Sequence, residues 1–260
     1  MNTLGNKIRV FRKLKGFSQL ELELATGTST GTLSRIENSD INPTKETVMR
    51  IAEVLNLTIL EYEYLIGSTA KPATEEEIKE VRESIKETFN DKMFFAYMID
   101  DRDRFIALSK GFKIAASISD EDEKNILMQY FPKVLIQDNL GIRKHTDPDY
   151  FDEIATYRFL EVYQDMYFME GDRCYEELME YINSNAEASK YWNKAKELYS
   201  KLSYRSFELR KLKVNMYGFK FTLEYSVERL VNHQRFRVIE FRPNNYILKF
   251  VKDFSSKLIS

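Results

Sequence analysis

The sequence predicts two domains, an N-terminal all-α domain of five helices and a C-terminal α+β domain with an antiparallel sheet. Three observations lead to this fold class. Residues 1–67 hold only four of the 35 aromatic residues but five of the nine glycines. Polar capping residues divide this first part into short helical segments. Alternation of apolar and polar residues appears after residue 206 and is strict along residues 219–228, where it indicates strands.

Composition excludes several classes of protein. The 260 residues carry 39 basic and 41 acidic side chains, so no overall positive field attracts nucleic acid or anionic lipid. One cysteine excludes an internal disulfide framework and a cysteine-based zinc site, and two histidines leave little for a metal site. No apolar run approaches the ~20 residues that span a bilayer. We therefore expect a cytoplasmic protein without membrane, metal or cofactor.

The first domain, residues 1–67, reads as five helices in succession. A serine or threonine stands at the start of each one, where its side chain can cap the helix, and Gly16 and Gly27 stand where the first two end. The third helix is expected to begin at Ser29. The predicted spans are 3–15, 18–26, 29–38, 44–55 and 58–66.

The run from Ser18 to Asn38, SQLELELATGTSTGTLSRIEN, resembles the helix-turn-helix of the lambda-repressor-like (XRE) class. Gly27 occupies the turn, and LSRIEN closes the third helix. The later run LNLTILEYEYLIG resembles the last helix of that class, so the resemblance covers residues 4–67. Two positions depart from the pattern. Glu23 replaces a small residue, and Gly31 lies early on the recognition helix, where glycine lowers helicity by ~1 kcal/mol relative to alanine.

This resemblance implies binding to double-stranded operator DNA through the third helix. It places Arg35 against guanine, a contact worth about 1–3 kcal/mol of discrimination. The alternative is that Arg35 pairs with Glu37 or Glu21 at the surface. Five basic residues and no acid within residues 1–16 independently predict phosphate contacts. The predicted DNA-binding residues are Gln19, Ser29, Thr30, Gly31, Thr32, Ser34, Arg35, Asn38 and Lys45, of which Gln19, Asn38 and Lys45 would contact phosphates.

A linker at residues 68–74 leads into the second domain, residues 75–260. Its first helix starts at Thr74, with Glu77 completing a capping box, and runs to Asp91. Two apolar runs around an Asp-rich turn predict a hairpin at residues 93–109. Helices are expected at 119–130, ending at Pro132, and at 149–169, 172–183 and 186–201. Strands are expected at 207–209, 212–214, 219–228 and 235–241, followed by a helix at 244–260 that covers the sheet or a second subunit.

The second domain resembles the MmyB-like ligand-binding domain, which has a PAS-like fold. The resemblance rests on FFAYMIDDRDRFIALSKGF, NILMQYFPKVLIQDNLGIRK, SKYWNKAKELY and YGFKFTLEYSVERL, in that order. It implies a homodimer that senses a small apolar molecule. Its second strand lacks the Trp-Asn pair common in that family. Aromatic side chains fill cores more often than they line pockets. The residues expected to line a pocket are Phe94, Tyr97, Ile106, Phe131, Phe159, Tyr163, Trp192, Phe221 and Tyr225.

Catalysis is not indicated. Gly27–Gly31 spells G-x-S-x-G, but a helix enters this turn where a hydrolase needs a strand, so Ser29 is interpreted as a helix cap. His145 and His233 both lie in predicted loops and form no nucleophile–base pair with other residues. The leading hypothesis is a dimeric transcriptional regulator with a ligand-sensing C-terminal domain. The alternatives are a regulator controlled by a peptide, which would need an all-helical C-terminal half, and an antitoxin-like protein that binds another protein.

Overall fold

A computed structural model describes residues 3–138, 140, 143, 144, 146–201, 211–216, 219–242 and 248. The chain forms two compact units, Met1–Pro72 with Asp165–Glu180, and Ala73–Gln164 with Tyr181–Ser260. The predicted strand at 207–209, the loop position of His145 and, apart from Leu248, the predicted helix at 244–260 lie outside the described residues. Within the described ranges, no helix is long and apolar enough to cross a membrane.

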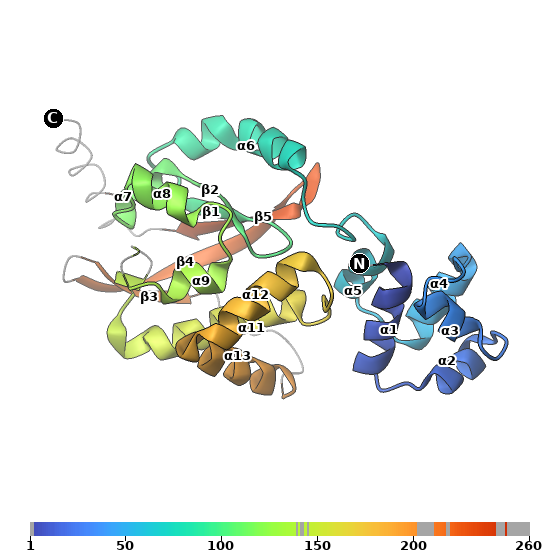
Figure 1. The fold of residues 1–260 in the computed structure, drawn as a ribbon. Coiled ribbons are helices and arrows are strands. Elements are labelled where there is room, and N and C mark those ends of the chain that lie inside the picture. Colours follow the sequence, from blue (N-terminus) through green and yellow to red (C-terminus); the bar gives the residue numbers. More distant parts are fainter. Residues whose placement is uncertain are drawn as a thin grey trace. The chain divides into compact units, whose positions relative to one another are not determined.

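Five short helices at the N-terminus confirm the all-α prediction (Figure 1). Hydroxyl side chains cap α1, α2, α4 and α5, as expected, because they accept hydrogen bonds from backbone N–H groups in the first turn. Ser18 and Thr58 each form a complete capping box with the glutamate three residues later. The bounds are α1 Leu4–Leu14, α2 Gln19–Thr26, α3 Thr32–Glu37, α4 Lys45–Val54 and α5 Ile59–Ile66.

The core of this helical cluster, called the head below, is apolar and tightly packed. Ile8, Phe11, Leu22 and Ile51 are almost fully buried. Gly5 lets α1 approach the end of α3, because a Cβ at this position would collide with the backbone carbonyl of Ile36. The close approach of α1 to α3 therefore depends on a glycine.

Residues Asp165–Glu180 belong to the same unit as the head. They include the end of α11 (Phe151–Met166), the turn after it, and most of α12 (Arg173–Ser184). In that turn the ring of Phe168 is fully buried, 5.8 Å from the ring of Phe11 and 5.5 Å from that of Tyr64, measured between centroids. The hydroxyl of Tyr167 donates to Oε1 of Glu61 at 2.7 Å. A segment distant in sequence thus completes the hydrophobic core of the head.

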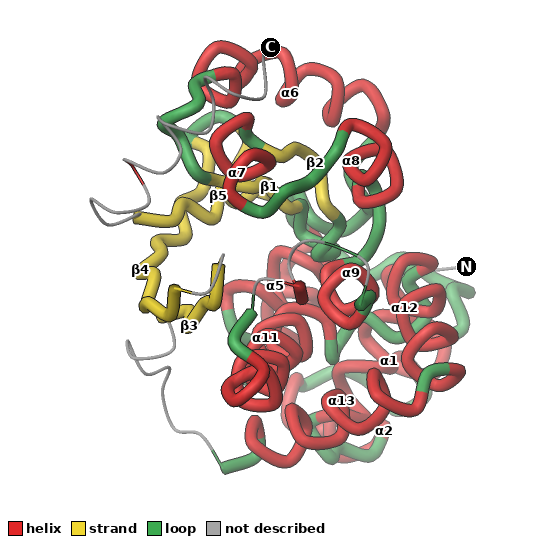
Figure 2. Tube along the Cα trace, turned by 90° about the vertical axis from the view of Figure 1, so that its left-hand side faces the viewer, coloured by secondary structure: helices red, strands yellow, loops and turns green. Residues whose placement is uncertain are grey.

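The second unit is built on a five-stranded antiparallel sheet with the strand order β2-β1-β5-β4-β3 (Figures 1 and 2). The strands are β1 Ala96–Ile99, β2 Phe105–Leu108, β3 Lys211–Met216, β4 Phe219–Leu230 and β5 His233–Arg242. This sheet confirms the predicted α+β class. It is inconsistent with the all-helical C-terminal half that the peptide-sensor alternative requires.

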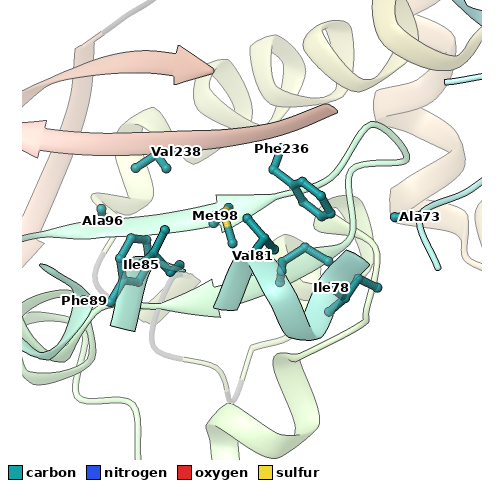
Figure 3. Packing of buried hydrophobic residues seen from close by; sticks show 10 residues of the cluster. Ala73, Ile78, Val81, Ile85, Phe89, Ala96, Met98, Phe236 and Val238 are labelled. Carbon is teal, nitrogen blue, oxygen red and sulfur yellow. The ribbon is translucent and has the colours of Figure 1, made fainter. Parts of the chain in front are cut away.

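One face of the sheet packs against α6 (Glu75–Asn90), which begins with the predicted capping box of Thr74 and Glu77. The predicted stripe of Ile78, Val81, Ile85 and Phe89 is buried. Figure 3 shows this stripe directed at Ala96 and Met98 of β1 and at Phe236 and Val238 of β5. These residues form a single apolar layer between helix and sheet.

The opposite face of the sheet carries aromatic side chains and lies toward α9 (Phe131–Ile136), α11 and α13 (Ala186–Tyr199) (Figure 2). The ring of Tyr97 lies 5.2 to 5.9 Å from those of Phe105, Phe112, Phe131 and Phe241, in tilted or edge-on arrangements that favour aromatic pairs. Burial raises the pKa of the Tyr97 hydroxyl. This layer is a closely packed second core.

Two local predictions about the helices after β2 are wrong. Pro132 was expected to end a helix, but it lies in the first turn of α9, where its missing N–H costs no hydrogen bond. The preceding helix, α8, is shorter than expected and spans Asp120–Ile126. A further helix, α7 (Lys110–Ala115), is not predicted from the sequence; it has six residues and is capped by Ser109. Its Gly111 lies where a Cβ would collide with backbone carbonyls of Lys92 and Phe94, so close packing requires glycine inside a helix.

We predict that Phe168→Ala destabilises the head, although residue 168 lies far from it in sequence. Truncating a fully buried phenylalanine costs about 3–5 kcal/mol, because the cavity left behind closes only partly. Hydrogen exchange of the α1 and α5 amides should therefore accelerate. Leu24→Ala, at an exposed position of α2, serves as the control and should leave this exchange unchanged. Unchanged exchange in Phe168→Ala would show that the head is stable without the Tyr167–Phe168 turn.

Candidate nucleic-acid interface

Helices α2 and α3 are joined by a turn with two left-handed glycines. Gly27 ends α2 with φ +69°, and Gly31 is the N-cap of α3 with φ +81°. The prediction that Ser29 caps the third helix is therefore wrong, because the helix begins at Thr32 and Gly31 makes no side-chain cap. Gly31 precedes the helix and does not lower its helicity. It supplies a backbone conformation that other residues adopt only with strain.

The missing cap on α3 is replaced by Glu23 of α2. This side chain is buried, and its Oε1 accepts a hydrogen bond from the backbone N–H of Leu33 at 2.8 Å. A carboxylate at a helix N-terminus is also favoured by the helix dipole. The departure of Glu23 from the small residue usual in the resembling family thus has a structural role. The signal in the sequence is an acid on the inward face of α2 followed by a helix that lacks a capping side chain.

A second buried carboxylate, Glu37, ties three helices of the head together. Its two oxygens accept hydrogen bonds from Arg12 of α1, at 2.6 and 3.0 Å, and from the amide of Gln19 at the start of α2, at 2.8 Å. Burial alone would raise the pKa of Glu37, but these hydrogen bonds and the charges of Arg12 and Arg9 bring it below its ordinary value. The orientation of α3, which ends at Glu37, is therefore coupled to α1 and α2.

This network leaves Arg35 available. The guanidinium is exposed and forms no ion pair or hydrogen bond within the described residues. Of the two surface partners considered for it, Glu37 is held by Arg12 and Gln19, and Glu21 accepts from the backbone N–H of Ser18 in the α2 capping box. A free, exposed arginine on a short helix whose orientation is held by buried hydrogen bonds is suited to contact a base edge.

The other predicted DNA-binding residues have different surroundings. Ser29, Thr30 and Gly31 are exposed in the turn, Thr32 and Ser34 are half-buried on α3, and Lys45 is exposed at the start of α4. Gln19 donates to Glu37, and Asn38 accepts from Arg9 through its Oδ1 at 2.6 Å. Any phosphate contact by Gln19 or Asn38 must therefore use side-chain atoms that are not engaged in these two hydrogen bonds.

The basic segment within residues 1–16 is less accessible than its sequence indicates. Lys7 is buried and donates to the carbonyls of Tyr64 and Ala70, and Arg12 is buried beside Glu37. Lys15 pairs with Glu61 at 2.9 Å. Lys7 and Arg12 therefore do not contribute to the basic end that the sequence predicts to suit phosphates, because their charges are paired inside the head.

The residues predicted to line a pocket in the second unit lie in separate clusters. Tyr97 and Phe131 belong to the aromatic layer, and Ile106 belongs to the layer under α6. Tyr225 lies against the guanidinium of Arg158 and 5.9 Å from the ring of Phe241, so it belongs to the aromatic layer of Tyr97 as well. Phe94 packs on Phe89, Phe159 on Tyr191, and Tyr163 on Trp192. The side chain of Phe221 is not among those described.

Comparison with known proteins agrees with this geometry. Residues 8–62 match the model of a helix-turn-helix family. The match contains α2, α3 and the turn between them, and it identifies this part of the chain as a DNA-binding regulatory domain. No curated protein matches the chain.

We predict that Gly31→Ala destabilises the turn by about 1–2 kcal/mol, the cost of a left-handed backbone at a residue with a Cβ. The cost is conformational, since no atom lies within 4 Å of the added Cβ. Gly31→Asn should lose less, because asparagine tolerates this conformation. Thermal unfolding of the head in both variants gives the comparison. Equal melting temperatures for Gly31→Ala, Gly31→Asn and wild type would show that residue 31 does not need a left-handed backbone conformation.

We also predict a pH-dependent role for Glu37. Because its pKa is lower in the folded protein than the ordinary 4.5, its contribution to stability is present above pH 4.5 and is lost as the pH falls through the folded value. The melting temperature of Glu37→Gln should therefore be well below that of wild type at pH 7, and the difference should narrow on acidification. Glu53→Gln, at an exposed site on α4, should show no such convergence. A difference that is independent of pH would indicate a purely steric role.

Proposed function

We propose that this protein is a transcriptional regulator of the lambda-repressor-like (XRE) class, which binds a specific operator as a homodimer and responds to a small molecule through its C-terminal domain. The helix-turn-helix at residues 8–62 supports DNA binding. The single observation that carries the proposal is Arg35, which is exposed on α3 and has no side-chain partner among the described residues, while two buried carboxylates hold that helix in place.

The predicted contacts divide into base readers and phosphate contacts. Thr30, Thr32, Ser34 and Arg35 would face bases in the major groove, whereas Gln19, Asn38 and Lys45 would contact the backbone. Only the residues that face bases confer sequence preference. The residues that contact the backbone set the affinity for any duplex.

The C-terminal part of the proposal rests on its architecture. A hairpin, a series of helices and three consecutive strands follow one another in the order that the resemblance to the MmyB-like, PAS-like domain implies. Such a domain would hold the ligand and supply the contact between two subunits. A two-fold symmetric dimer would match a palindromic operator.

Footprinting on the DNA upstream of the protein's own gene tests operator binding. We expect two protected half-sites with centres separated by one helical turn, ~34 Å, or a multiple of it. Protection of a single half-site by a monomer would contradict the dimer, and absence of any protected site on this or on selected random DNA would contradict sequence-specific binding.

We predict that Arg35→Ala weakens binding to the operator by about 1–3 kcal/mol and relaxes preference at one base pair. Lys45→Ala should weaken binding to operator and random duplex alike and reduce the salt dependence, because it removes a phosphate contact. Titrations of both duplexes with each variant make the comparison. Equal losses on both duplexes for Arg35→Ala would show that Arg35 contacts only phosphate.

A further inference from the structure

The turn between α11 and α12, residues 166–172, packs into the head and is called the tip below. The ring of Phe168 lies against the rings of Phe11 in α1 and Tyr64 in α5, and all three side chains are almost fully buried. The neighbouring Tyr167 donates its hydroxyl hydrogen bond to Glu61 of α5. The tip is therefore part of the core of the head and not a contact on its surface.

The carboxylate of Glu61 connects the tip to two helices of the head. It is fully buried, and it accepts a hydrogen bond from the backbone N–H of Thr58 at 2.7 Å. Lys15 of α1 lies 2.9 Å away, and Tyr167 donates to the same carboxylate. A buried carboxylate that loses one of its donors is costly inside a protein. The position of the tip is thus coupled to α1 and α5.

Helix α1 meets the tip and the recognition helix with different faces. Residues three or four apart lie on the same face of a helix. Phe11 and Lys15 form the face that meets the tip and α5. On another face, Arg9 donates to the backbone carbonyl of Glu37 at 3.0 Å, and Arg12 donates to its carboxylate at 2.6 Å. Because α1 moves as one helix, a movement of the tip that shifts α1 also shifts the end of α3.

The two helices that carry the tip continue into the second unit. Most of α11 and the end of α12 belong to that unit, whereas the tip belongs to the unit of the head. The chain runs through α11 to the tip and leaves it through α12. A structural change in the second unit can therefore be carried along these helices to the tip.

We propose that the tip is the part of the chain through which the second domain regulates DNA binding. When it is docked on α1 and α5, it holds α1, and through Glu37 also α3, in the arrangement that binds the operator. When it leaves the head, operator affinity falls. Tyr167 and Phe168 act through α1 and are positioning residues. This inference rests on the proposed operator binding and specifies how that binding is regulated.

The proposal has a reciprocal consequence. If docking of the tip strengthens operator binding by some factor, operator binding must stabilise the docked tip by the same factor. A tip that only supports the fold of the head would be equally stable with and without the operator. The stability of the docked tip in the presence of DNA therefore separates regulation from a purely structural role.

Hydrogen exchange of the full-length protein tests this consequence, with the duplex protected in footprinting, or one selected from random DNA, as the operator. Saturating operator should slow exchange of the Met169 and Asp172 amides, which are hydrogen-bonded within the tip, by about fivefold or more, a typical coupling between two sites. Random duplex is the control for direct shielding by DNA. It should slow these amides less, because it is bound mainly through its phosphates.

Operator affinity gives a second readout. Phe168→Ala should bind the operator about fivefold or more weakly than wild type, and Tyr167→Phe, which removes only the hydrogen bond to Glu61, should lose less. Affinity for random duplex should change less than affinity for the operator in both variants. Tyr157→Phe is the matched control, on the part of α11 that belongs to the second unit, and it should bind as wild type does.

Unchanged exchange of the tip amides on operator binding would overturn the inference and leave operator binding standing. Unchanged operator affinity in folded Phe168→Ala would do the same, and equal losses on operator and random duplex would reduce the tip to a structural role. If Phe168→Ala does not fold, as judged by its melting temperature, the exchange of wild type decides. A wild type that prefers no duplex over random DNA would reject the proposed function itself, and this inference with it.

Discussion

The buried carboxylate of Glu37 is the interaction on which the DNA-binding geometry depends. It accepts hydrogen bonds from α1 and α2 while standing at the end of α3, so one side chain relates three helices. Glu23 adds a second link, from α2 to the backbone at the start of α3. Removing one partner from such a buried set leaves an uncompensated charge, which costs far more than a surface ion pair. The six-residue α3 therefore depends on its neighbours for its orientation.

Charged groups organise the second unit in a similar way. In the turn between β1 and β2, Asp100 accepts from the backbone N–H groups of Arg102 and Arg104, which shapes the turn. Arg235 and Arg237 of β5 then pair with Asp101 and Asp103 at 3.1 and 2.8 Å. These contacts connect the hairpin to the central strand of the sheet. Arg82 differs from these arginines, because its Nε donates to the backbone carbonyl of Ile106 and no carboxylate among the described residues pairs with it.

Much of the fold could be predicted because its signals are local. The hydroxyl caps at Ser18, Thr58 and Thr74, and the alternation along residues 219–228, act between residues a few positions apart and survive into the structure. Errors arose where tertiary contacts outweighed local preference. Ser29 is a good cap in isolation, yet α3 starts after Gly31 because Glu23 reaches its N-terminus from another helix. Lys7 and Arg12 look like surface cations, yet each has buried acceptors more than 20 residues away.

The sequence by itself determined the two-part organisation, the helix-turn-helix and the identity of the exposed Arg35, since periodicity, caps and turn glycines carry that information along the chain. Only the tertiary structure decided which charged side chains are paired inside the head and which distant segment packs into its core. Phe168 reaches Phe11 across more than 150 residues, and Arg82 meets Ile106 from a different element. Such contacts depend on how elements pack in space, and no local pattern in the chain encodes them.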